Sequence, residues 1–274
     1  SGATTEPLFA DPRLRKLSFT GSTEVGRVLL RQASDNVLRT SMELGGNAPL
    51  LVFDDADLDV AVEGAFNAKL RNGGEACTAA NRIYAQTGVA EEFTRRLAER
   101  VGSVRVGHGI EDGTQLGPVI DADARERIDG LVRDAVAGGS RVLAGGSALD
   151  RPGYFYAPTV LADVPADARV MTEEIFGPVA PVATFATEDE AVALANSTPF
   201  GLISYVFTTD LARSLRLAER IETGMLAVNS GVISNPAAPF GGVKQSGLGR
   251  EGSAEGIEEY LETVYVGIAD PYAR

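Results

Sequence analysis

Short apolar runs alternate with longer amphipathic stretches along the whole chain. The short runs are rich in β-branched residues, which fit the surface of a sheet, and they predict strands at 17–19, 40–43, 49–53, 141–144, 179–185, 202–208 and 225–229. The stretches with helical spacing predict helices near 90–102, 121–137, 187–196 and 210–222. Such alternation is typical of an α/β fold with a mostly parallel sheet flanked by helices.

A further helix is predicted after the loop that begins at residue 21. Ser22 or Thr23 would cap it, because a hydroxyl can accept the unpaired backbone N–H groups of the first turn. Its buried face is predicted to carry Val25, Val28 and Leu29. The loop matches no dinucleotide or Walker-type glycine motif, although its backbone amides could bind a phosphate at the start of the helix.

Asp57 would cap another helix, which is predicted to end at the glycine pair after Asn72. Its apolar face is expected to consist of Leu58, Ala61, Val62, Ala65 and Phe66. Near the end of the chain, residues 260–268 alternate weakly between apolar and polar side chains. We predict that they form an oligomerisation strand, since an unpaired strand can add to another subunit, and we expect a homo-oligomer.

Composition narrows the classes of function. The formal net charge of the 274 residues is −13, and a negative surface repels nucleic acid and anionic membranes. No apolar stretch approaches the ~18 residues that span a bilayer, and the N-terminus lacks the pattern of a secretion signal. One cysteine and one histidine exclude an internal disulfide and argue against a Cys/His zinc site. We therefore predict a cytoplasmic protein without a metal site.

Few side chains of the sequence are candidates for a catalytic role. His108 lies between glycines and is predicted to be a surface turn residue, so a side-chain base would be a carboxylate. Cys77 follows a glycine pair in a loop that could aim its sulfur into a cleft, although a lone cysteine is often only a small buried apolar residue. Glu43 ends a predicted strand, where active-site groups of α/β folds gather, but an exposed acid before a turn has the same pattern.

Five segments, taken in order, resemble the signatures of the aldehyde dehydrogenase superfamily. They are FTGSTEVG at 19–26, ELGG at 43–46, Cys77, EEIFGP at 173–178 and PFGGVKQSG at 239–247. The 34 positions from Glu43 to Cys77 also match the usual spacing of the family, and the resemblance covers essentially the whole chain. Residues 229–234 and 239–252 are similar to succinate-semialdehyde dehydrogenases in particular.

The resemblance implies a covalent mechanism. Cys77 would be the nucleophile that attacks the aldehyde carbonyl and becomes a thioester after hydride transfer to NAD or NADP. Glu43 would be the base that activates Cys77 or the hydrolytic water. The backbone N–H of Cys77 would supply half of an oxyanion hole.

The same resemblance assigns binding residues. The cofactor-binding positions would be Gly21, Ser22, Leu44, Gly45, Glu174 and Phe176. Arg71 and Ser234 would bind the distal carboxylate of the small-molecule aldehyde, with Phe240 as a third substrate-binding residue. A guanidinium suits a carboxylate because it donates two parallel hydrogen bonds. Glutarate semialdehyde would satisfy the same residues, and Ala79 excludes the second cysteine with which the subfamily often forms a redox switch.

The resemblance also divides the chain. Residues 1–46 would be the C-terminal remnant of the NAD(P)-binding domain, 47–245 the catalytic domain, and 246–274 a C-terminal helix with the oligomerisation strand. We expect a truncated form of a longer enzyme, because upstream residues that the family uses have no counterpart here. Two alternatives stay open: a catalytically impaired structural or oligomerising module, and a thiol esterase that needs only Cys77 and Glu43.

Overall fold

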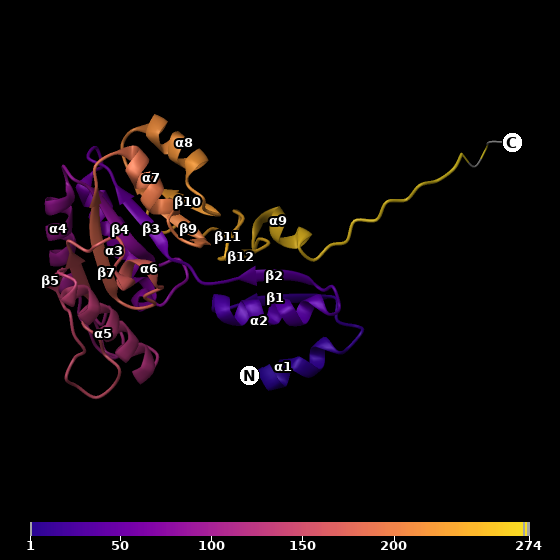
Figure 1. Ribbon diagram of the computed structural model, residues 1–274, viewed down its shortest axis with the longest axis horizontal. Coiled ribbons are helices and arrows are strands. Elements are labelled where there is room, and N and C mark those ends of the chain that lie inside the picture. Colours follow the sequence, from indigo (N-terminus) through magenta and orange to yellow (C-terminus); the bar gives the residue numbers. More distant parts are fainter. Residues whose placement is uncertain (1, 271, 273–274) are drawn as a thin grey trace.

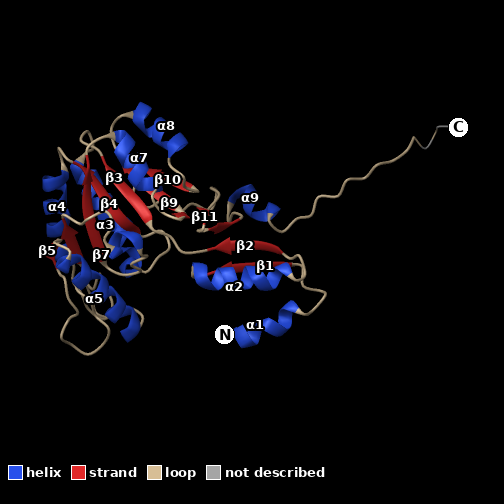
Figure 2. Ribbon diagram, in the orientation of Figure 1, coloured by secondary structure: helices blue, strands red, loops and turns tan. Residues whose placement is uncertain are grey.

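The computed structural model of the chain describes residues 2–270 and 272. A large sheet is covered by helices on both faces, a small sheet lies beside it, and the C-terminal segment extends away from both (Figure 1). Strands and helices follow one another along most of the chain (Figure 2). The predicted α/β class is confirmed.

The predicted elements of the large sheet and its helices are found within two residues of their predicted ends. The strands of the large sheet are β3 (Ala48–Val52), β4 (Ala80–Gln86), β5 (Arg141–Ala144), β6 (Thr159–Ala162), β7 (Val179–Phe185), β9 (Ile203–Phe207) and β10 (Met225–Val228). Its helices are α3 (Leu58–Leu70), α4 (Ala90–Gly102), α5 (Ala122–Ala137), α6 (Arg169–Thr172), α7 (Glu188–Asn196) and α8 (Leu211–Arg220).

The large sheet is almost entirely parallel. Its strand order is β10, β9, β3, β4, β7, β6, β5, and β5 alone pairs antiparallel with its neighbour. Side chains of alternate strand residues enter two cores, because successive residues of a strand point to opposite faces. Leu50 and Val52 pack with α3 and α4, whereas Leu51 and Phe53 pack with α5, α6, α7 and α8.

Two strands of this sheet and a short helix were not predicted. The strands β4 and β6 and the helix α6 lack a clear apolar period. In β4 the signal is masked by Arg82, which is buried because its guanidinium donates to the carbonyls of Asn47, Leu194 and Ala195. A buried polar side chain of this kind is tolerated only when its donors are paired.

The small sheet is formed by both ends of the chain. It consists of β1 (Lys16–Thr20), β2 (Arg39–Glu43) and β12 (Gly247–Leu248), with β12 antiparallel to β2. The helices nearby are α1 (Gly2–Phe9), α2 (Thr23–Ser34) and α9 (Ser253–Glu258). Two short strands, β8 (Phe200–Gly201) and β11 (Val243–Lys244), form a separate pair.

The predicted buried face of α2 is partly wrong. Leu29 is buried, but Val25 and Val28 are 48% and 49% exposed. The face that packs on the small sheet instead includes Gly26 and Ala33, whose small side chains allow close approach. The valines therefore lie on the side of α2 turned away from β1 and β2.

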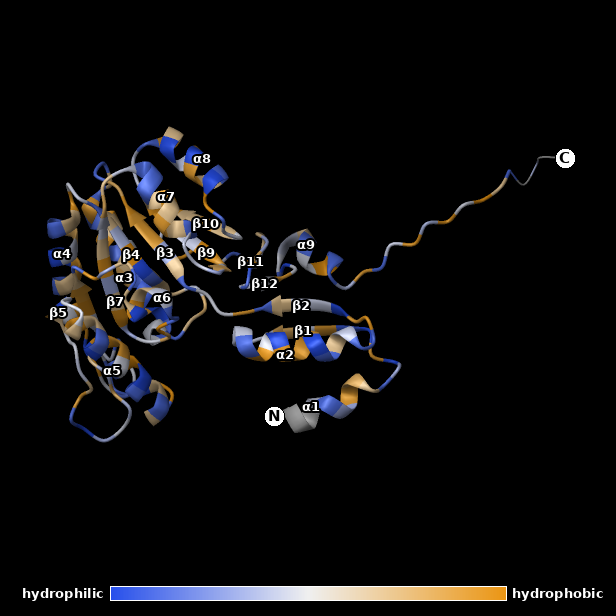
Figure 3. Ribbon diagram, viewed as in Figure 1, coloured by the Kyte–Doolittle hydropathy of each residue, from blue (hydrophilic) through white to orange (hydrophobic). Residues whose placement is uncertain are grey.

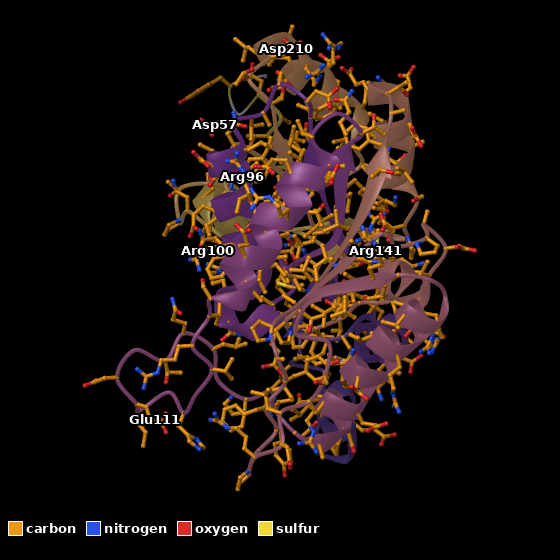
Figure 4. The ribbon with its side chains drawn as sticks, turned by 90° about the vertical axis from the view of Figure 1, so that its left-hand side faces the viewer. Asp57, Arg96, Arg100, Glu111, Arg141 and Asp210 are labelled. Carbon is orange, nitrogen blue, oxygen red and sulfur yellow. The ribbon has the colours of Figure 1, made fainter. Side chains whose placement is uncertain are left out.

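The predicted caps agree with the structure. The Ser22 side chain accepts a hydrogen bond from the backbone of Val25, and Asp57 accepts from the backbone of Asp59 and Val60. On the outer surface, Arg96 and Arg100 of α4 reach carboxylates of α3 (Figure 4). His108 is exposed in a turn, as predicted.

Residues 261–270 form no strand within this chain, and their apolar side chains are largely exposed (Figure 3). Pairing of this segment with another subunit stays a prediction. None of the helices in the described part of the chain is long and apolar enough to cross a membrane. The described residues also contain no group of three or more His, Cys, Asp or Glu arranged to hold a metal ion.

Candidate active site

The thiol of Cys77 is carried by a tightly packed turn between α3 and β4. The 3-10 turn Arg71–Gly74 follows α3, and its residues Asn72, Gly73 and Gly74 all have positive φ. A Cβ built on Gly74 would lie only 2.2 Å from the carbonyl oxygen of Gly177, so glycine is required at this close approach. The turn directs Cys77 toward residues 44–47, which join β2 to β3, and a Cβ built on Gly46 would lie 2.7 Å from the Cys77 carbonyl oxygen.

Glu43 is the last residue of β2 and is 7% exposed. Its Oε2 atom is buried without a hydrogen-bond partner among the described residues. The pKa of Glu43 is raised to about 7, mostly by burial and also by the Glu251 carboxylate, while the positive charge of Arg250 acts in the opposite direction. A carboxyl group with this pKa exchanges protons near neutral pH, which suits a general base.

Cys77 and Glu43 share one cavity of about 810 Å³ at the junction of the two sheets. Burial raises the pKa of the Cys77 thiol, and the negative charges of Glu43 and Glu174 raise it further. The backbone N–H groups of Cys77 and Thr78 act in the opposite direction. At neutral pH the thiol therefore retains its proton and needs a base to become a nucleophile.

Eight of the residues predicted from the sequence line this cavity. They are Gly21, Ser22, Glu43, Leu44, Gly45, Cys77, Glu174 and Phe176. The loops after β1 and β2 bring the first five together, because these parallel strands end at the same edge of the small sheet. The roles of the eight residues stay predictions, although their common location agrees with a single site.

Glu174 is held by the backbone that follows β2. Its Oε1 atom accepts a hydrogen bond of 3.2 Å from the Gly46 N–H, and a Cβ built on Gly45 would lie 2.7 Å from Oε2. Nearby, Phe176 has φ of 45° and is 37% exposed. A left-handed backbone is unfavourable for an aromatic residue, and such strain is often found at ligand sites.

Three predicted substrate-binding residues do not line the cavity. Arg71 is exposed. Burial raises the pKa of Tyr205 to about 12, and the charge of Arg71 acts in the opposite direction; the Tyr205 hydroxyl donates to the Thr78 carbonyl beside Cys77. Ser234 is exposed in the loop after β10. Phe240 exchanges two backbone hydrogen bonds with Glu251.

The loop that carries Ser234 nevertheless packs against α3. A Cβ built on Gly231 would lie 2.1 Å from the Gly64 carbonyl oxygen and 3.1 Å from the Ala68 nitrogen. This contact brings the loop close to the end of α3, where Arg71 follows. The loop that carries Ser234 therefore lies close to the end of α3, which Arg71 follows.

Sequence reasoning gave no role to Arg127 and Glu75, which are two of the charged residues that line the cavity. Arg127 of α5 donates to the carbonyls of Glu174 and Ile175, and Glu75 accepts from the Ile120 N–H. Charged residues on the outer face of a helix or in a loop carry no periodic signal that distinguishes them from ordinary surface residues. For Glu75, the indication in the sequence that it belongs to the site is its position two residues before Cys77.

Glu43 also lines a second cavity of about 400 Å³ on the side of α9. Ser18, Ser41 and Tyr260 contribute polar groups to it, and the hydroxyls of Ser18 and Tyr260 are hydrogen-bonded at 2.9 Å. Glu43 thus lines two cavities, and Cys77 lines only the larger one.

Comparison with known proteins agrees with this geometry. A family model described as "Aldehyde dehydrogenase family" matches residues 1–266. A succinate-semialdehyde dehydrogenase of Paenarthrobacter nicotinovorans is 60% identical over 97% of this chain and 59% of its own length. A glutarate-semialdehyde dehydrogenase of Pseudomonas putida is 52% identical over 93% of this chain and 53% of its own length.

A solved structure described as an Escherichia coli NADP-dependent enzyme has the same fold. Its TM-score is 0.94 at 50% identity, and the match covers 96% of this chain and 55% of that one. The chain thus spans a little over half the length of the relatives that it matches.

Proposed function

The chain belongs to the aldehyde dehydrogenase family, and from this premise we propose that it oxidises an aldehyde to a carboxylate with NAD or NADP through a thioester on Cys77. The observation that carries the proposal is the shared cavity of Cys77 and Glu43, the one a thiol and the other a buried carboxyl group with a pKa near neutrality. The same cavity contains Glu174 and the start of α2, where a cofactor would bind.

The first step is addition of the sulfur to the carbonyl carbon. Glu43 accepts the proton of the Cys77 thiol, the S–C bond forms, and the carbonyl electrons move to oxygen. The backbone N–H of Cys77 is available to stabilise the resulting oxyanion. A bound NAD or NADP would supply the acceptor for the hydride that the carbon then loses, which leaves a thioester.

The second half is hydrolysis of that thioester. Glu43 first releases the thiol proton to solvent and then accepts a proton from water, and the hydroxide adds to the thioester carbon. The C–S bond breaks, Glu43 returns its proton to the leaving sulfur, and the new carboxylic acid loses its proton to solvent. The products are a carboxylate and the free thiol of Cys77. Because the buried Oε2 of Glu43 has no partner among the described residues, it is free to accept a proton in both halves.

The residues around the cavity fit a dinucleotide. The first turn of α2, beside Gly21 and Ser22, presents backbone N–H groups at the start of a helix, and such groups suit a pyrophosphate. The Glu174 carboxylate suits the hydroxyl groups of a ribose, and Phe176 presents an aromatic side chain beside it. Leu44 and Gly45 would lie next to the nicotinamide.

We propose succinic semialdehyde as the substrate, with Arg71 and Ser234 binding its carboxylate. The support is the relative at 60% identity, whose name is succinate-semialdehyde dehydrogenase, and the location of Arg71 at the start of residues 71–77, the thiol turn, which ends at Cys77. Glutarate semialdehyde is the alternative, because a relative at 52% identity is named for it. Both aldehydes carry a distal carboxylate for the same guanidinium.

The test is to incubate the protein with succinic semialdehyde and either cofactor and to follow the absorbance of the reduced nicotinamide. We expect reduction that is lost in Cys77→Ala. If the cofactor is not reduced but p-nitrophenyl acetate is hydrolysed in a Cys77-dependent way, the protein is a thiol esterase. Absence of both reactions would contradict the proposal and favour a structural or oligomerising module.

A further inference from the structure

A buried serine holds the connection between β2 and β3. Ser246 lies between β11 and β12, where the large and small sheets meet, and is 0% exposed (Figure 1). Its hydroxyl donates a hydrogen bond of 2.8 Å to the Gly45 carbonyl and accepts one of 3.0 Å from the Gly201 N–H. Its backbone carbonyl accepts a further hydrogen bond of 3.0 Å from the Leu44 N–H. Ser246 is therefore bound to Leu44 and Gly45, which line the active-site cavity.

The peptide group between Gly45 and Gly46 is held at both of its ends. The Gly45 carbonyl and the Gly46 N–H belong to one planar unit, which in its trans form directs them to opposite sides of the chain. The carbonyl accepts from Ser246, and the N–H donates to Oε1 of Glu174 at 3.2 Å. Ser246 and Glu174 therefore grip the same peptide from opposite sides.

The serine fixes the direction of the N–H. Rotation of this peptide would withdraw the N–H from Glu174, and two adjoining glycines offer little resistance because they lack a Cβ. Ser246 opposes the rotation, since its hydroxyl is itself fixed by the Gly201 N–H and is enclosed on all sides. A hydrogen bond to the carbonyl also polarises the peptide and makes its N–H a stronger donor.

We propose that Ser246 is a positioning residue, which fixes the Gly45–Gly46 peptide so that its N–H holds the Glu174 carboxylate in place as an acceptor for the hydroxyl groups of a bound ligand. The identity of that ligand, a nicotinamide cofactor, rests on the proposed function. The chain of contacts from Ser246 through the peptide to Glu174 does not. A serine that only filled the core would affect stability without changing the state of Glu174.

The charge state of Glu174 is one readout of this role. Burial raises the pKa of Glu174, and the Gly46 N–H is the foremost of the groups that lower it, ahead of Arg127 and Lys69, whereas Glu24 raises it. Loss of the N–H contact would therefore raise the pKa of Glu174. A protonated carboxyl group is also a weaker acceptor than a carboxylate.

The first test needs no ligand. In Ser246→Ala the peptide loses its anchor, so the Gly46 amide hydrogen should exchange with solvent about tenfold faster. The pKa of Glu174 should rise in the same variant, followed by NMR of carboxyl groups labelled with carbon-13, in which the signal lost in Glu174→Gln identifies the residue. Unchanged exchange at Gly46, or an unchanged pKa of Glu174, would overturn the proposal.

Thr159 provides a matched control. Its side chain is fully buried as well, and its hydroxyl accepts from the Gly146 N–H at 2.9 Å and donates to the Ala157 carbonyl at 2.7 Å. Thr159→Val removes the same pair of hydrogen bonds in β6 and should lower the denaturation midpoint, as Ser246→Ala does. It should leave exchange at Gly46 and the pKa of Glu174 unchanged. Equal changes in both variants would show general loosening and would overturn the positioning role.

Cofactor binding gives a second readout. We expect Ser246→Ala to weaken binding of reduced NADP or NAD by about three- to tenfold, measured by fluorescence, and to have little further effect when Glu174 is already Ala. Equal losses in both backgrounds would overturn the proposal, because Ser246 would then act on the cofactor by another route.

The two proposals fail separately. If the unaltered protein binds neither cofactor, or if Glu174→Ala does not weaken binding, the proposed function is contradicted at this residue, whereas the exchange and the titration still decide the role of Ser246. If Ser246→Ala does not fold, Ser246→Cys takes its place, because a thiol is a weaker donor and acceptor than a hydroxyl. It should change both quantities in the same direction, and the absence of either change would overturn the proposal.

Discussion

Two carboxylates next to the only thiol of the chain control its charge. Below a pH of about 7 Glu43 holds a proton, and above it the negative charge of Glu43 raises the pKa of the Cys77 thiol. Ionised Glu43 therefore disfavours ionisation of the Cys77 thiol before the reaction, although it accepts protons during the reaction. These two effects of one residue can be separated because they change different rates.

We predict that Glu43→Gln accelerates alkylation of Cys77 by iodoacetamide at a pH slightly above neutrality. The substitution removes a negative charge, so the pKa of the thiol falls and the reactive thiolate becomes more abundant. Aldehyde oxidation should fall about 10²- to 10⁴-fold in the same variant, since water loses its base. A variant with slower alkylation would contradict the electrostatic role.

Arg71 is predicted to act on the charged end of the substrate only. In Arg71→Ala, kcat/KM for succinic semialdehyde should fall about 10- to 100-fold, because charge-assisted hydrogen bonds are lost. Oxidation of an uncharged aliphatic aldehyde of similar length should change little. The control is Arg95→Ala, which removes an exposed arginine paired with Glu92 and Glu99. Equal losses for both aldehydes would exclude carboxylate binding by Arg71.

At this scale the sequence predicted more of the site by resemblance than by pattern. Cys77 and Glu43 looked ordinary when considered alone, because a lone thiol and an acid before a turn are common. Ser246 was given no role, since a serine in a glycine-rich segment is typical of a turn. Its contact with Gly45 joins residues 201 positions apart, so local spacing does not reveal it.

At the scale of elements, helices and strands whose apolar residues recur with a clear period could be predicted from the sequence. Elements that bury polar residues among apolar ones could not. The limits of α4 were predicted because its apolar face meets a single core. The strand β4 was missed because buried Arg82 and Asn81 interrupt its apolar run. The predicted buried face of α2 was partly wrong, because the size of a side chain, and not its hydrophobicity alone, decides whether it fits against the small sheet.

The contact between the β2–β3 connection and the thiol turn yields a prediction about geometry. Gly46→Ala would place a Cβ 2.7 Å from the Cys77 carbonyl oxygen, so the backbone of one segment must move. We expect kcat to fall by about 10²-fold, because small displacements of reacting groups are costly, and the free energy of unfolding to fall by about 1–3 kcal/mol.

The matched control is Gly130→Ala in the interior of α5. A Cβ there would meet nothing within 4 Å, and the backbone is helical. This variant should keep its activity and gain about 0.5–1 kcal/mol of stability in chemical denaturation. If Gly46→Ala behaved like Gly130→Ala, the thiol turn would not depend on this contact.

At the scale of the whole molecule, the C-terminal segment is the feature that a single chain does not explain. Its apolar side chains are exposed, with Tyr265 at 92% and Ile268 at 80%, and none of residues 261–270 belongs to an apolar core of the described chain. Exposed apolar surface of this kind often marks an interface. A second copy of the chain is the partner that we predict.

Deletion of residues 261–274 is therefore expected to lower the molar mass of the particle in solution, measured by light scattering after size-exclusion chromatography. The large sheet should keep its thermal unfolding transition, because none of the described residues in the deleted segment belongs to its cores. An unchanged particle mass would show that oligomerisation, if present, uses another surface.

The most direct test of the chemistry is to detect the covalent intermediate. Glu43→Gln should be mixed with succinic semialdehyde and NAD or NADP at a pH high enough to ionise the thiol, quenched in acid, digested and examined by mass spectrometry. We predict an acyl adduct on the peptide that contains Cys77, which accumulates because hydrolysis lacks its base. Reduced cofactor without any adduct on Cys77, or an adduct on another residue, would contradict the thioester mechanism.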